Sequence, residues 1–190
     1  MDLTEQKAAL RKAAFAARAE AFGIASVADA NAALLQEIGP VKGRVISAYM
    51  AMRTELDPST AMTELAQSNR ICVPVIAGKG LPLTFREWTP GCEMADGPFG
   101  ARVPATGDWL EPEILIAPLV AFDADCNRLG YGGGFYDRTL ERLRGLRPTR
   151  AIGFAYAAQR LDGLVVEPTD QRLDAVVTET GIHRPLAAPA

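Results

Sequence analysis

Short apolar runs alternate with longer amphipathic segments along most of the chain. Continuous apolar runs bounded by turn residues are typical of strands buried on both faces of a sheet. Segments in which apolar residues recur every three or four positions are typical of helices packed on one side. The alternation predicts an α/β fold with a mostly parallel sheet covered by helices on both faces. The expected strands span residues 45–50, 71–76, 114–122, 151–156 and 175–178.

Four helical segments are expected, and capping residues mark several of their ends. Asp2 and Glu5 can form a capping box that opens an alanine-rich first helix. Gly39, followed by proline, stops the second helix. Asp57 and Pro58 fit the N-cap and first position of the third helix. The expected helices span residues 2–22, 27–38, 57–68 and 137–143.

Residues 78–107 are rich in glycine, proline and aromatic side chains, and they form a long excursion from the alternating pattern. Residues 83–88 alternate like an exposed strand. Loops of this length are often functional. Phe85, Trp88 and Phe99 therefore either wall a pocket for a flat ligand or pack the excursion onto the domain. Just before it, Pro74 predicts the end or the edge of a strand, because proline has no N–H to donate.

The segment between the strand at 114–122 and the helix at 137–143 contains Gly130, Gly132, Gly133 and Gly134 around Tyr131. Glycines let a ligand approach the backbone, and a helix start offers unpaired N–H groups and a partial positive charge. An anion site for a nucleotide phosphate is one interpretation, and a tight connection is the other. Neither the P-loop nor the Rossmann fingerprint fits, because the P-loop's closing Lys and Ser/Thr and the third Rossmann glycine are missing.

Length, composition and charge limit the class of protein. The chain has 190 residues and is 48% hydrophobic, which suits one domain over residues 1–190. A net charge of −3 gives no reason to expect nucleic-acid or membrane-surface binding. The three cysteines share no C-x-x-C spacing and there is one histidine, so neither a disulfide framework nor a zinc site is expected. Without a signal peptide or a long apolar span, we expect a soluble cytoplasmic protein with a frayed tail over 183–190.

Charged side chains at the ends of elements are the candidate chemical groups. Lys7 and Arg11 lie four residues apart and share one helix face, either as a solvated stripe or as a cation pair facing a polyanion. Glu55 follows the carboxyl end of the first strand, the usual ligand edge of a parallel sheet. Asp137 could instead cap a helix, and Asp174 could be a solvated boundary residue. The candidate carboxylates are Glu55, Asp123, Asp137, Asp170 and Asp174.

These groups match the needs of phosphoryl transfer, in which catalysis depends on placement and charge neutralisation. Mg²⁺ takes one or two carboxylates together with phosphate oxygens. The only histidine, His183, lies close to the end of the chain, so a Ser-His-Asp or Cys-His mechanism has little support.

The glycine segment is part of a longer string, Phe122-Asp123 followed by Arg128-Leu129-Gly130-Tyr131-Gly132-Gly133-Gly134-Phe135-Tyr136-Asp137-Arg138. This string resembles the signature of the 5-formyltetrahydrofolate cyclo-ligase family, also called 5,10-methenyltetrahydrofolate synthetases. Weaker similarity follows in the same order at Lys7-x-x-Leu10-Arg11, 50–55, 85–100, Gln159, Glu167-x-x-Asp170 and 174–179. The resemblance implies a single three-layer α/β/α domain.

The resemblance also implies an activity and a set of site residues. Such enzymes use ATP and Mg²⁺ to convert 5-formyltetrahydrofolate into 5,10-methenyltetrahydrofolate, ADP and phosphate, with no protein nucleophile. Asp137 and Asp174 would position Mg²⁺, and the expected assembly is a monomer. Folate would contact Met50, Glu55, Tyr131, Gly132, Gly133, Gly134 and Phe135. ATP would contact Lys7, Arg11, Arg128, Leu129, Gly130, Tyr131, Gly132, Gly133, Gly134, Phe135 and Tyr136.

Three positions depart from the family pattern. Val103 stands where a glutamate is usual, Leu119 where a glycine is usual, and Thr169 where a histidine is common. Two other interpretations follow from these departures. The chain could be a non-catalytic relative that binds folate and nucleotide, or an ATP-dependent enzyme of the same fold that acts on another small amide or formyl compound.

Overall fold

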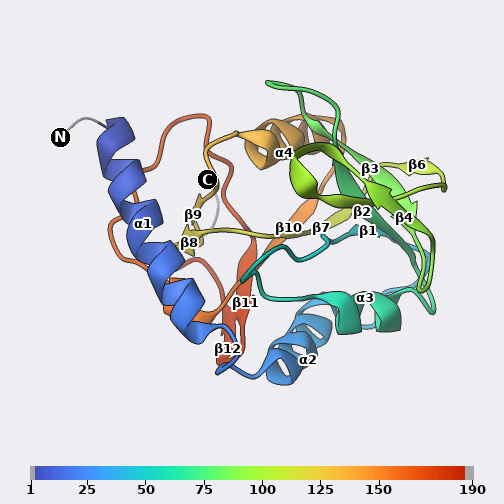
Figure 1. Cartoon of the computed structure of the whole chain (residues 1–190), viewed down its shortest axis with the longest axis horizontal. Coiled ribbons are helices and arrows are strands. Elements are labelled where there is room, and N and C mark those ends of the chain that lie inside the picture. Colours follow the sequence, from blue (N-terminus) through green and yellow to red (C-terminus); the bar gives the residue numbers. More distant parts are fainter. Residues whose placement is uncertain (1–2, 187–190) are drawn as a thin grey trace.

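The computed structural model describes residues 3–186 and contains one large central sheet (Figure 1). Its eight strands lie in the order β12-β11-β10-β7-β1-β2-β3-β6. The five from β11 to β2 are parallel, and antiparallel strands flank them on both sides. The predicted, mostly parallel α/β sheet is confirmed. The strands are β1 Val45–Ser47, β2 Arg70–Ile76, β3 Leu83–Trp88, β6 Trp109–Leu110, β7 Ile114–Ala117, β10 Arg150–Phe154, β11 Ala175–Thr178 and β12 Gly181–His183.

Helices cover both faces of this sheet (Figure 1). On one face, α2 (Val27–Ile38) and α3 (Ser59–Leu65) bury Leu34 and Met62 against the strands. On the other face, α4 (Phe135–Leu146) buries Leu140 and Leu143 in a second core. The long helix α1 (Leu3–Ala21) packs beside the small sheet of β8 (Ala121–Phe122) and β9 (Arg128–Leu129). Burial on both faces explains why the parallel strands are apolar throughout.

The predicted helix positions hold well, with shifts at their ends. The second helix has the predicted bounds, and Gly39 ends it with a φ of 77°. Asp57 caps the third, since its Oδ1 accepts the Ser59 N–H at 2.9 Å, although Pro58 is the N-cap residue. The Asp2 capping box lies outside the described residues. The fourth helix starts at Phe135, so Asp137 lies within its first turn and does not cap it.

Two predicted strands are shorter than expected and a third is interrupted. The apolar run at 114–122 divides into β7 and β8, because Pro118 has no N–H for a ladder bond. The first strand ends at Ser47 and the fourth at Phe154, although Tyr49 and Tyr156 beyond them remain buried. The chain stays buried beyond the last hydrogen-bonded residue of each strand. The apolar pattern follows burial, so it predicted strands that were too long.

The excursion at 78–107 is not separate from the main fold. Its strand β3 pairs antiparallel with β2 and is buried on both faces of the sheet: Phe85, 2% exposed, lies in the core beneath α4, and Trp88, 8% exposed, lies in the core beneath α2 and α3. The expectation of an exposed strand was wrong, and these two aromatic residues pack the excursion. Pro74 lies within an internal strand, beyond Cys72, the last residue that pairs with β1. The rest forms a hairpin of β4 (Met94–Asp96) and β5 (Arg102–Pro104), with the turn η1 (Pro98–Gly100) at its tip.

The expectation of a frayed tail from His183 was wrong at its beginning. His183 ends β12, pairs with Val176, and lies against Phe122 with ring centroids 5.4 Å apart. The next residue, Arg184, forms an ion pair with the buried carboxylate of Glu37. Residues 187–190 lie outside the described part of the chain. Within that part, no helix is both long and apolar enough to cross a membrane.

Candidate functional site

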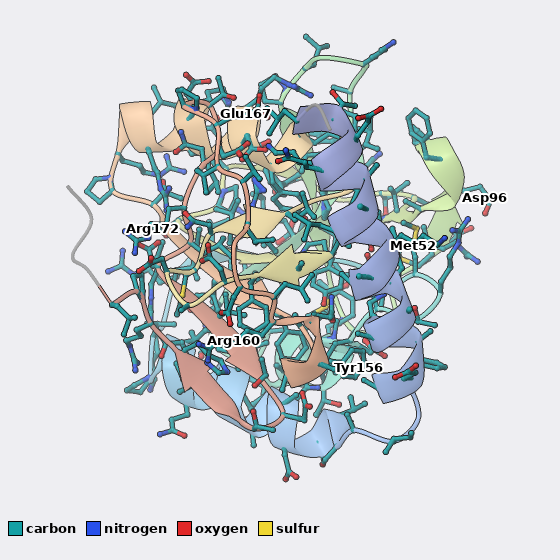
Figure 2. All side chains as sticks on the ribbon, turned by 90° about the vertical axis from the view of Figure 1, so that its left-hand side faces the viewer. Met52, Asp96, Tyr156, Arg160, Glu167 and Arg172 are labelled. Carbon is teal, nitrogen blue, oxygen red and sulfur yellow. The ribbon has the colours of Figure 1, made fainter. Side chains whose placement is uncertain are left out.

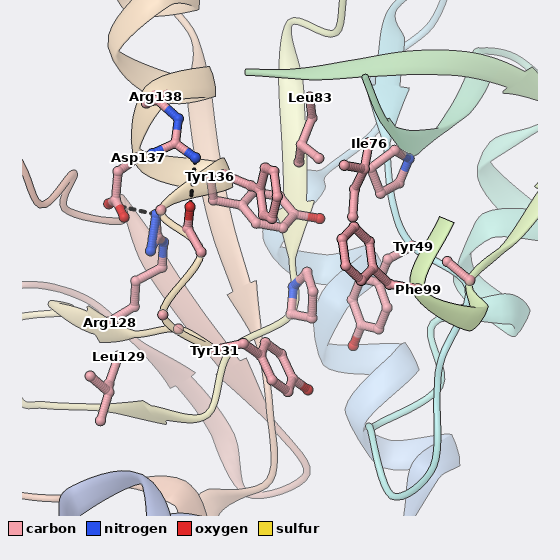
Figure 3. Close-up of a pocket in the computed structure, with 18 of the residues that line it drawn as sticks. Tyr49, Ile76, Leu83, Phe99, Arg128, Leu129, Tyr131, Tyr136, Asp137 and Arg138 are labelled. Carbon is pink, nitrogen blue, oxygen red and sulfur yellow. Dashed lines mark hydrogen bonds and ion pairs between the residues drawn. The ribbon is translucent and has the colours of Figure 1, made fainter. Parts of the chain in front are cut away.

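A cavity of about 840 Å³ lies at the carboxyl ends of β1, β2 and β7 (Figure 3). Helix α1, the glycine segment, the start of α4 and the tip of the β4–β5 hairpin complete its wall. This is the edge at which open parallel sheets bind ligands. The cavity is lined by these predicted ATP and folate contacts: Lys7, Arg11, Met50, Glu55, Arg128, Leu129, Gly130, Tyr131, Gly132, Gly133, Gly134, Phe135 and Tyr136.

The glycine segment forms one wall because its backbone takes conformations that other residues avoid. Gly132 and Gly134 have φ angles of 99° and 64°, and Gly134 is the N-cap residue of α4. Arg11 donates through Nε to the Gly130 carbonyl at 2.8 Å. A Cβ atom built on Gly132 would lie 3.4 Å from the guanidinium of Arg11. The segment thus leaves room for a ligand between a cation and a helix start.

Lys7 is held at the same end of the cavity by two carboxylates. Its Nζ lies 2.6 Å from Oε2 of Glu167 and 3.0 Å from Oδ2 of Asp170. Glu167 lies beside the N-terminal end of α1 (Figure 2). Burial opposes the charged form of Lys7, but its hydrogen bonds to the two acids outweigh burial and raise its pKa above the ordinary value. Lys7 is therefore a fixed cation, and the solvated-stripe interpretation does not describe it.

Asp137 lies on the cavity wall in contact with a buried arginine. Arg128 donates to Asp137 Oδ1 at 2.7 Å, and its side chain is only 4% exposed. Burial lowers the pKa of Arg128, and the charge of Asp137 opposes that effect. The same Oδ1 accepts the Gln171 N–H at 2.9 Å, while Oδ2 accepts no hydrogen bond among the described residues. Figure 3 shows Asp137 and Arg138 together at the start of α4.

Asp174 lies away from the cavity wall. Its Oδ2 accepts the Ala151 N–H at 2.7 Å and contacts Arg144 at 3.2 Å, where β10 and β11 begin. It does not line the cavity, so Asp137 and Asp174 do not meet there. Asp123 is also bound locally, to the N–H groups of Asp125 and Asn127 in its own turn. Within residues 3–186, no three His, Cys, Asp or Glu side chains are grouped as a metal site.

The opposite end of the cavity is apolar and aromatic. Figure 3 shows Tyr49, Ile76, Leu83 and Phe99 on one side, facing Tyr131 and Tyr136. Of the three aromatic residues predicted to wall a pocket or to pack, Phe99 alone lines the cavity, and it is 80% exposed. The Tyr136 hydroxyl is buried and has no partner among the described residues. Such a group is available to a ligand.

Among residues 3–186, Glu55 is the only carboxylate at this apolar end. It is 6% exposed, and its Oε2 accepts the Met52 N–H at 2.9 Å. Its Oε1 accepts a hydrogen bond from the hydroxyl of Tyr131. Burial, and next the charge of Glu55, raise the pKa of Tyr131 well above its ordinary value, so the phenol stays protonated.

Sequence reasoning missed several cavity residues. Arg138 was part of the signature string but received no role, and it donates to the Gly133 carbonyl at 2.5 Å. Glu167 and Asp170 were noted as a motif, but nothing in their spacing shows that they bind Lys7, 160 or more residues away. Arg18 does not line the cavity but contacts Tyr131, which does; it gave no signal because it is one of several cations on an alanine-rich helix.

Comparison with known proteins shows the family of the chain. The model of the 5-formyltetrahydrofolate cyclo-ligase family matches residues 3–179. The chain belongs to this family. A 5-formyltetrahydrofolate cyclo-ligase of Escherichia coli K12 is 33% identical over 152 residues, which cover 75% of this chain and 81% of that protein. One of Mycolicibacterium smegmatis is 31% identical, over 73% of this chain and 75% of the other.

Two solved structures titled 5,10-methenyltetrahydrofolate synthetase share the fold. The structure from Aquifex aeolicus has a TM-score of 0.74 and 23% identity, covering 97% of this chain and 95% of its own. The one from Mycoplasma pneumoniae has a TM-score of 0.70 and 24% identity, covering 91% and 98%. At these identities the likeness supports the fold of the cyclo-ligase family alone.

The three departures from the cyclo-ligase pattern lie in different surroundings. Leu119 is 2% exposed in the core beneath α4. Val103 pairs with Ala95 in the β4–β5 hairpin and does not line the cavity. Thr169 lines the cavity beside Asp170. Only one of the three departures therefore faces a ligand directly.

Proposed function

We propose that the protein converts 5-formyltetrahydrofolate into 5,10-methenyltetrahydrofolate with ATP and Mg²⁺, releasing ADP and phosphate. One observation carries the proposal: a single cavity has fixed cations and a glycine-lined helix start at one end, and an aromatic wall with one buried carboxylate at the other. The first end suits a triphosphate and the second suits a flat, polar-edged heterocycle. Family membership supports the same assignment.

At the phosphate end, side chains and backbone groups bind the phosphates of ATP and orient them. Lys7 uses two of its three N–H donors on carboxylates, which leaves the third for a phosphate oxygen. Arg11 bonds Gly130 through Nε, so its two terminal nitrogens are available to a phosphate. The backbone from Arg128 to Tyr136 follows the nucleotide, and the glycines allow it to come close.

At the folate end, the chain selects a flat ring. Met50 and the aromatic residues provide apolar contact, and planar rings stack favourably on such surfaces. Glu55 can accept hydrogen bonds from neighbouring N–H groups of the reduced pterin. Residues 131–135 lie between the two ends and therefore contact both ligands.

The reaction then needs no protein nucleophile. The formyl oxygen attacks the γ-phosphorus of ATP and ADP leaves, so the formyl oxygen carries the phosphoryl group and the formyl carbon becomes electrophilic. N10 attacks the formyl carbon and loses its proton to water, the C–O bond to phosphate breaks, and inorganic phosphate leaves. The substrate supplies both reacting atoms, and no histidine lines the cavity. The protein contributes placement and positive charge.

Asp137 fits a magnesium role. Its Oδ2 is available on the cavity wall next to the phosphate end, and Mg²⁺ commonly takes one carboxylate and completes its shell with water and phosphate oxygens. Bound Mg²⁺ would neutralise charge on the transferring phosphate. Asp174 remains a predicted second ligand, although its carboxylate contacts Ala151 and Arg144 outside the cavity wall. We further propose that the enzyme is a cytoplasmic monomer.

Thr169 motivates two other functions. A change on the cavity wall could leave a non-catalytic protein that binds folate and nucleotide, or an ATP-dependent enzyme for another small formyl or amide compound. The first predicts binding of both ligands without product. The second predicts ATP hydrolysis that does not depend on 5-formyltetrahydrofolate.

One assay separates these functions. Purified protein is mixed with ATP, Mg²⁺ and 5-formyltetrahydrofolate, and the methenyl chromophore is followed by absorbance while ADP is measured in parallel. Product that appears only with ATP, in a one-to-one ratio to ADP, supports the ligase. Folded protein that binds both ligands and forms no chromophore contradicts it.

A further inference from the structure

Arg18 is a buried cation next to the cavity but not on its wall. It lies on α1 two helical turns after Arg11 and is 4% exposed. Its NH1 group donates to the Tyr131 hydroxyl at 2.6 Å, and its Nε donates to Thr54 Oγ1 at 3.0 Å. Among the described residues it forms no ion pair with a carboxylate. A buried guanidinium is costly unless hydrogen bonds or a nearby negative charge offset its loss of hydration.

The compensation comes through one hydroxyl. A guanidinium can only donate hydrogen bonds, so Tyr131 accepts from Arg18 and must direct its own proton elsewhere. That proton goes to Oε1 of Glu55. The contacts therefore form a directed chain, Arg18 to Tyr131 to Glu55, in which the cation stabilises the carboxylate through a neutral bridge.

The rings around Arg18 fix this geometry. Its guanidinium carbon lies 5.1 Å from the Phe15 ring centroid and 5.8 Å from that of Tyr131. The two rings are themselves 5.8 Å apart. Phe15 and Arg18 belong to the same helix as Lys7 and Arg11, so one helix carries both the cations of the phosphate end and the arginine that contacts Tyr131.

We infer that Arg18 is a positioning residue for the folate end: through the Tyr131 hydroxyl it holds the Glu55 carboxylate in place, oriented toward the N–H groups of the reduced pterin. The inference rests on the proposed function, because it takes Glu55 as a folate contact. Both oxygens of Glu55 are held, one by Tyr131 and the other by the Met52 N–H. The carboxylate is thus fixed before a ligand arrives, which reduces the ordering cost of binding.

The test compares Arg18→Gln, Arg18→Lys, Tyr131→Phe and the double variant Arg18→Gln/Tyr131→Phe in the chromophore assay. Tyr131→Phe keeps the ring and removes only the bridging oxygen, so it remains informative if Arg18→Gln fails to fold. We expect the KM for 5-formyltetrahydrofolate to rise about tenfold in Arg18→Gln and in Tyr131→Phe. In Arg18→Gln, which changes no residue of the cavity wall, the KM for ATP should change less than about twofold. The double variant should be no worse than the worse single variant, since both break one chain.

Arg18→Lys should recover part of the loss, because it restores a cation that can donate to the hydroxyl. Lys12→Gln is the matched control, since Lys12 is an exposed cation on the same helix. It should leave both KM values unchanged. Thermal unfolding of each variant shows whether the fold is intact.

Additive effects in the double variant, or equal rises in both KM values of Arg18→Gln, would overturn the inference and leave Arg18 a structural residue. Wild-type protein that forms no product but binds 5-formyltetrahydrofolate would contradict the proposed reaction only. The same four variants would then be compared by their Kd values in calorimetry, with the same expected pattern. Wild-type protein that binds no 5-formyltetrahydrofolate would overturn the inference and the proposed function together.

Discussion

At the scale of single residues, the cavity is built from charges that are already paired. Lys7 contacts two carboxylates, and Asp137 contacts the buried Arg128. Pairing holds each charge in place and lowers the cost of keeping it away from water. A substitution at one of these residues therefore removes a ligand contact and also leaves the other member of its ion pair without a partner.

Lys7→Met and Arg11→Met should each raise the KM for ATP by about tenfold, because each removes a charge-assisted hydrogen bond to phosphate. The raised pKa of Lys7 means that it stays charged throughout the neutral range, so its effect should not vary between pH 6 and 8. Steady-state kinetics at both pH values measure this. Lys12→Met on the same helix is the control, and unchanged ATP kinetics in both site variants would refute the phosphate role.

Asp137→Asn should raise the Mg²⁺ concentration needed for half-maximal rate about tenfold, because the amide is a weaker ligand for a hard cation. The amide still accepts the Gln171 N–H, so the loop stays in place. Asp137→Ala is a poorer test, since unpairing the buried Arg128 should cost about 3–5 kcal/mol of stability.

Asp174→Asn, measured in parallel, tests whether Asp174 is a second magnesium ligand. If the Mg²⁺ concentration for half-maximal rate rises equally in both variants, both carboxylates bind the metal. If it rises in Asp137→Asn alone, only Asp137 binds it. Normal Mg²⁺ dependence in Asp137→Asn contradicts its metal role.

Thr169→His and Val103→Glu restore the residues common in the family at two departures. Thr169 lines the cavity beside Asp170 and Val103 does not line it, so only Thr169→His should change kcat or the KM for ATP or 5-formyltetrahydrofolate, by about threefold or more. Val103→Glu serves as the matched control. A larger kinetic change in Val103→Glu would show that the hairpin acts on the substrate.

At the scale of elements, the turn from β9 into α4 combines two requirements in a few residues. It must reverse the chain through positive φ angles, and it must leave its N–H groups open to the cavity. Glycine meets both, which explains why a tight connection and an anion site are not exclusive interpretations here.

Gly132→Ala should destabilise the protein by about 1–3 kcal/mol and raise the KM for ATP, because a φ of 99° strains any side chain and the new Cβ would approach Arg11. Gly145→Ala is the matched control. Its Cβ would enter open space within α4, so stability should rise by about 0.5–1 kcal/mol with kinetics unchanged. Chemical denaturation and ATP kinetics measure both. Unchanged ATP kinetics in Gly132→Ala would contradict a phosphate site at the glycines.

At the scale of the whole molecule, the sheet joins the two halves of the chain, and its outer strand carries the only histidine. His183 packs on Phe122, and burial, with a smaller effect of Arg160, lowers its pKa below the ordinary value. The unfolded chain therefore binds more protons than the folded chain as the pH falls through about 6.5. Stability should decline in that range.

Denaturant unfolding of the wild type at pH 7.5 and 5.5 should show a lower free energy of unfolding at the lower pH. His183→Gln should flatten this dependence, since the side chain no longer titrates. Glu87 and Glu113 have pKa values lowered by Arg70 and by the Val45 N–H, respectively, so their contributions persist above pH 4.5 and are lost only at lower pH. If the free energy of unfolding of His183→Gln depends on pH as it does in the wild type, another group causes the loss of stability.

The elements were largely predictable because burial on both sheet faces leaves continuous apolar runs, and local caps mark helix ends. The second helix has the predicted bounds, and the last parallel strand does too. The errors came from residues such as Tyr49, Tyr156 and His183, whose burial or exposure depends on neighbours that are distant in sequence. Apolar patterns report burial and not hydrogen-bonded pairing.

The sequence by itself determined the fold class, the order of strand, glycine turn and helix, and the family, because these depend on local periodicity and on a contiguous string. The tertiary structure decided which charges meet. It joined Lys7 to Glu167 and Asp170, linked Arg18 to Glu55 through Tyr131, and put Asp174 away from the cavity. The contacts of Lys7 and Arg18 arise because α1 packs against segments more than a hundred positions away, and no local pattern encodes such a pairing.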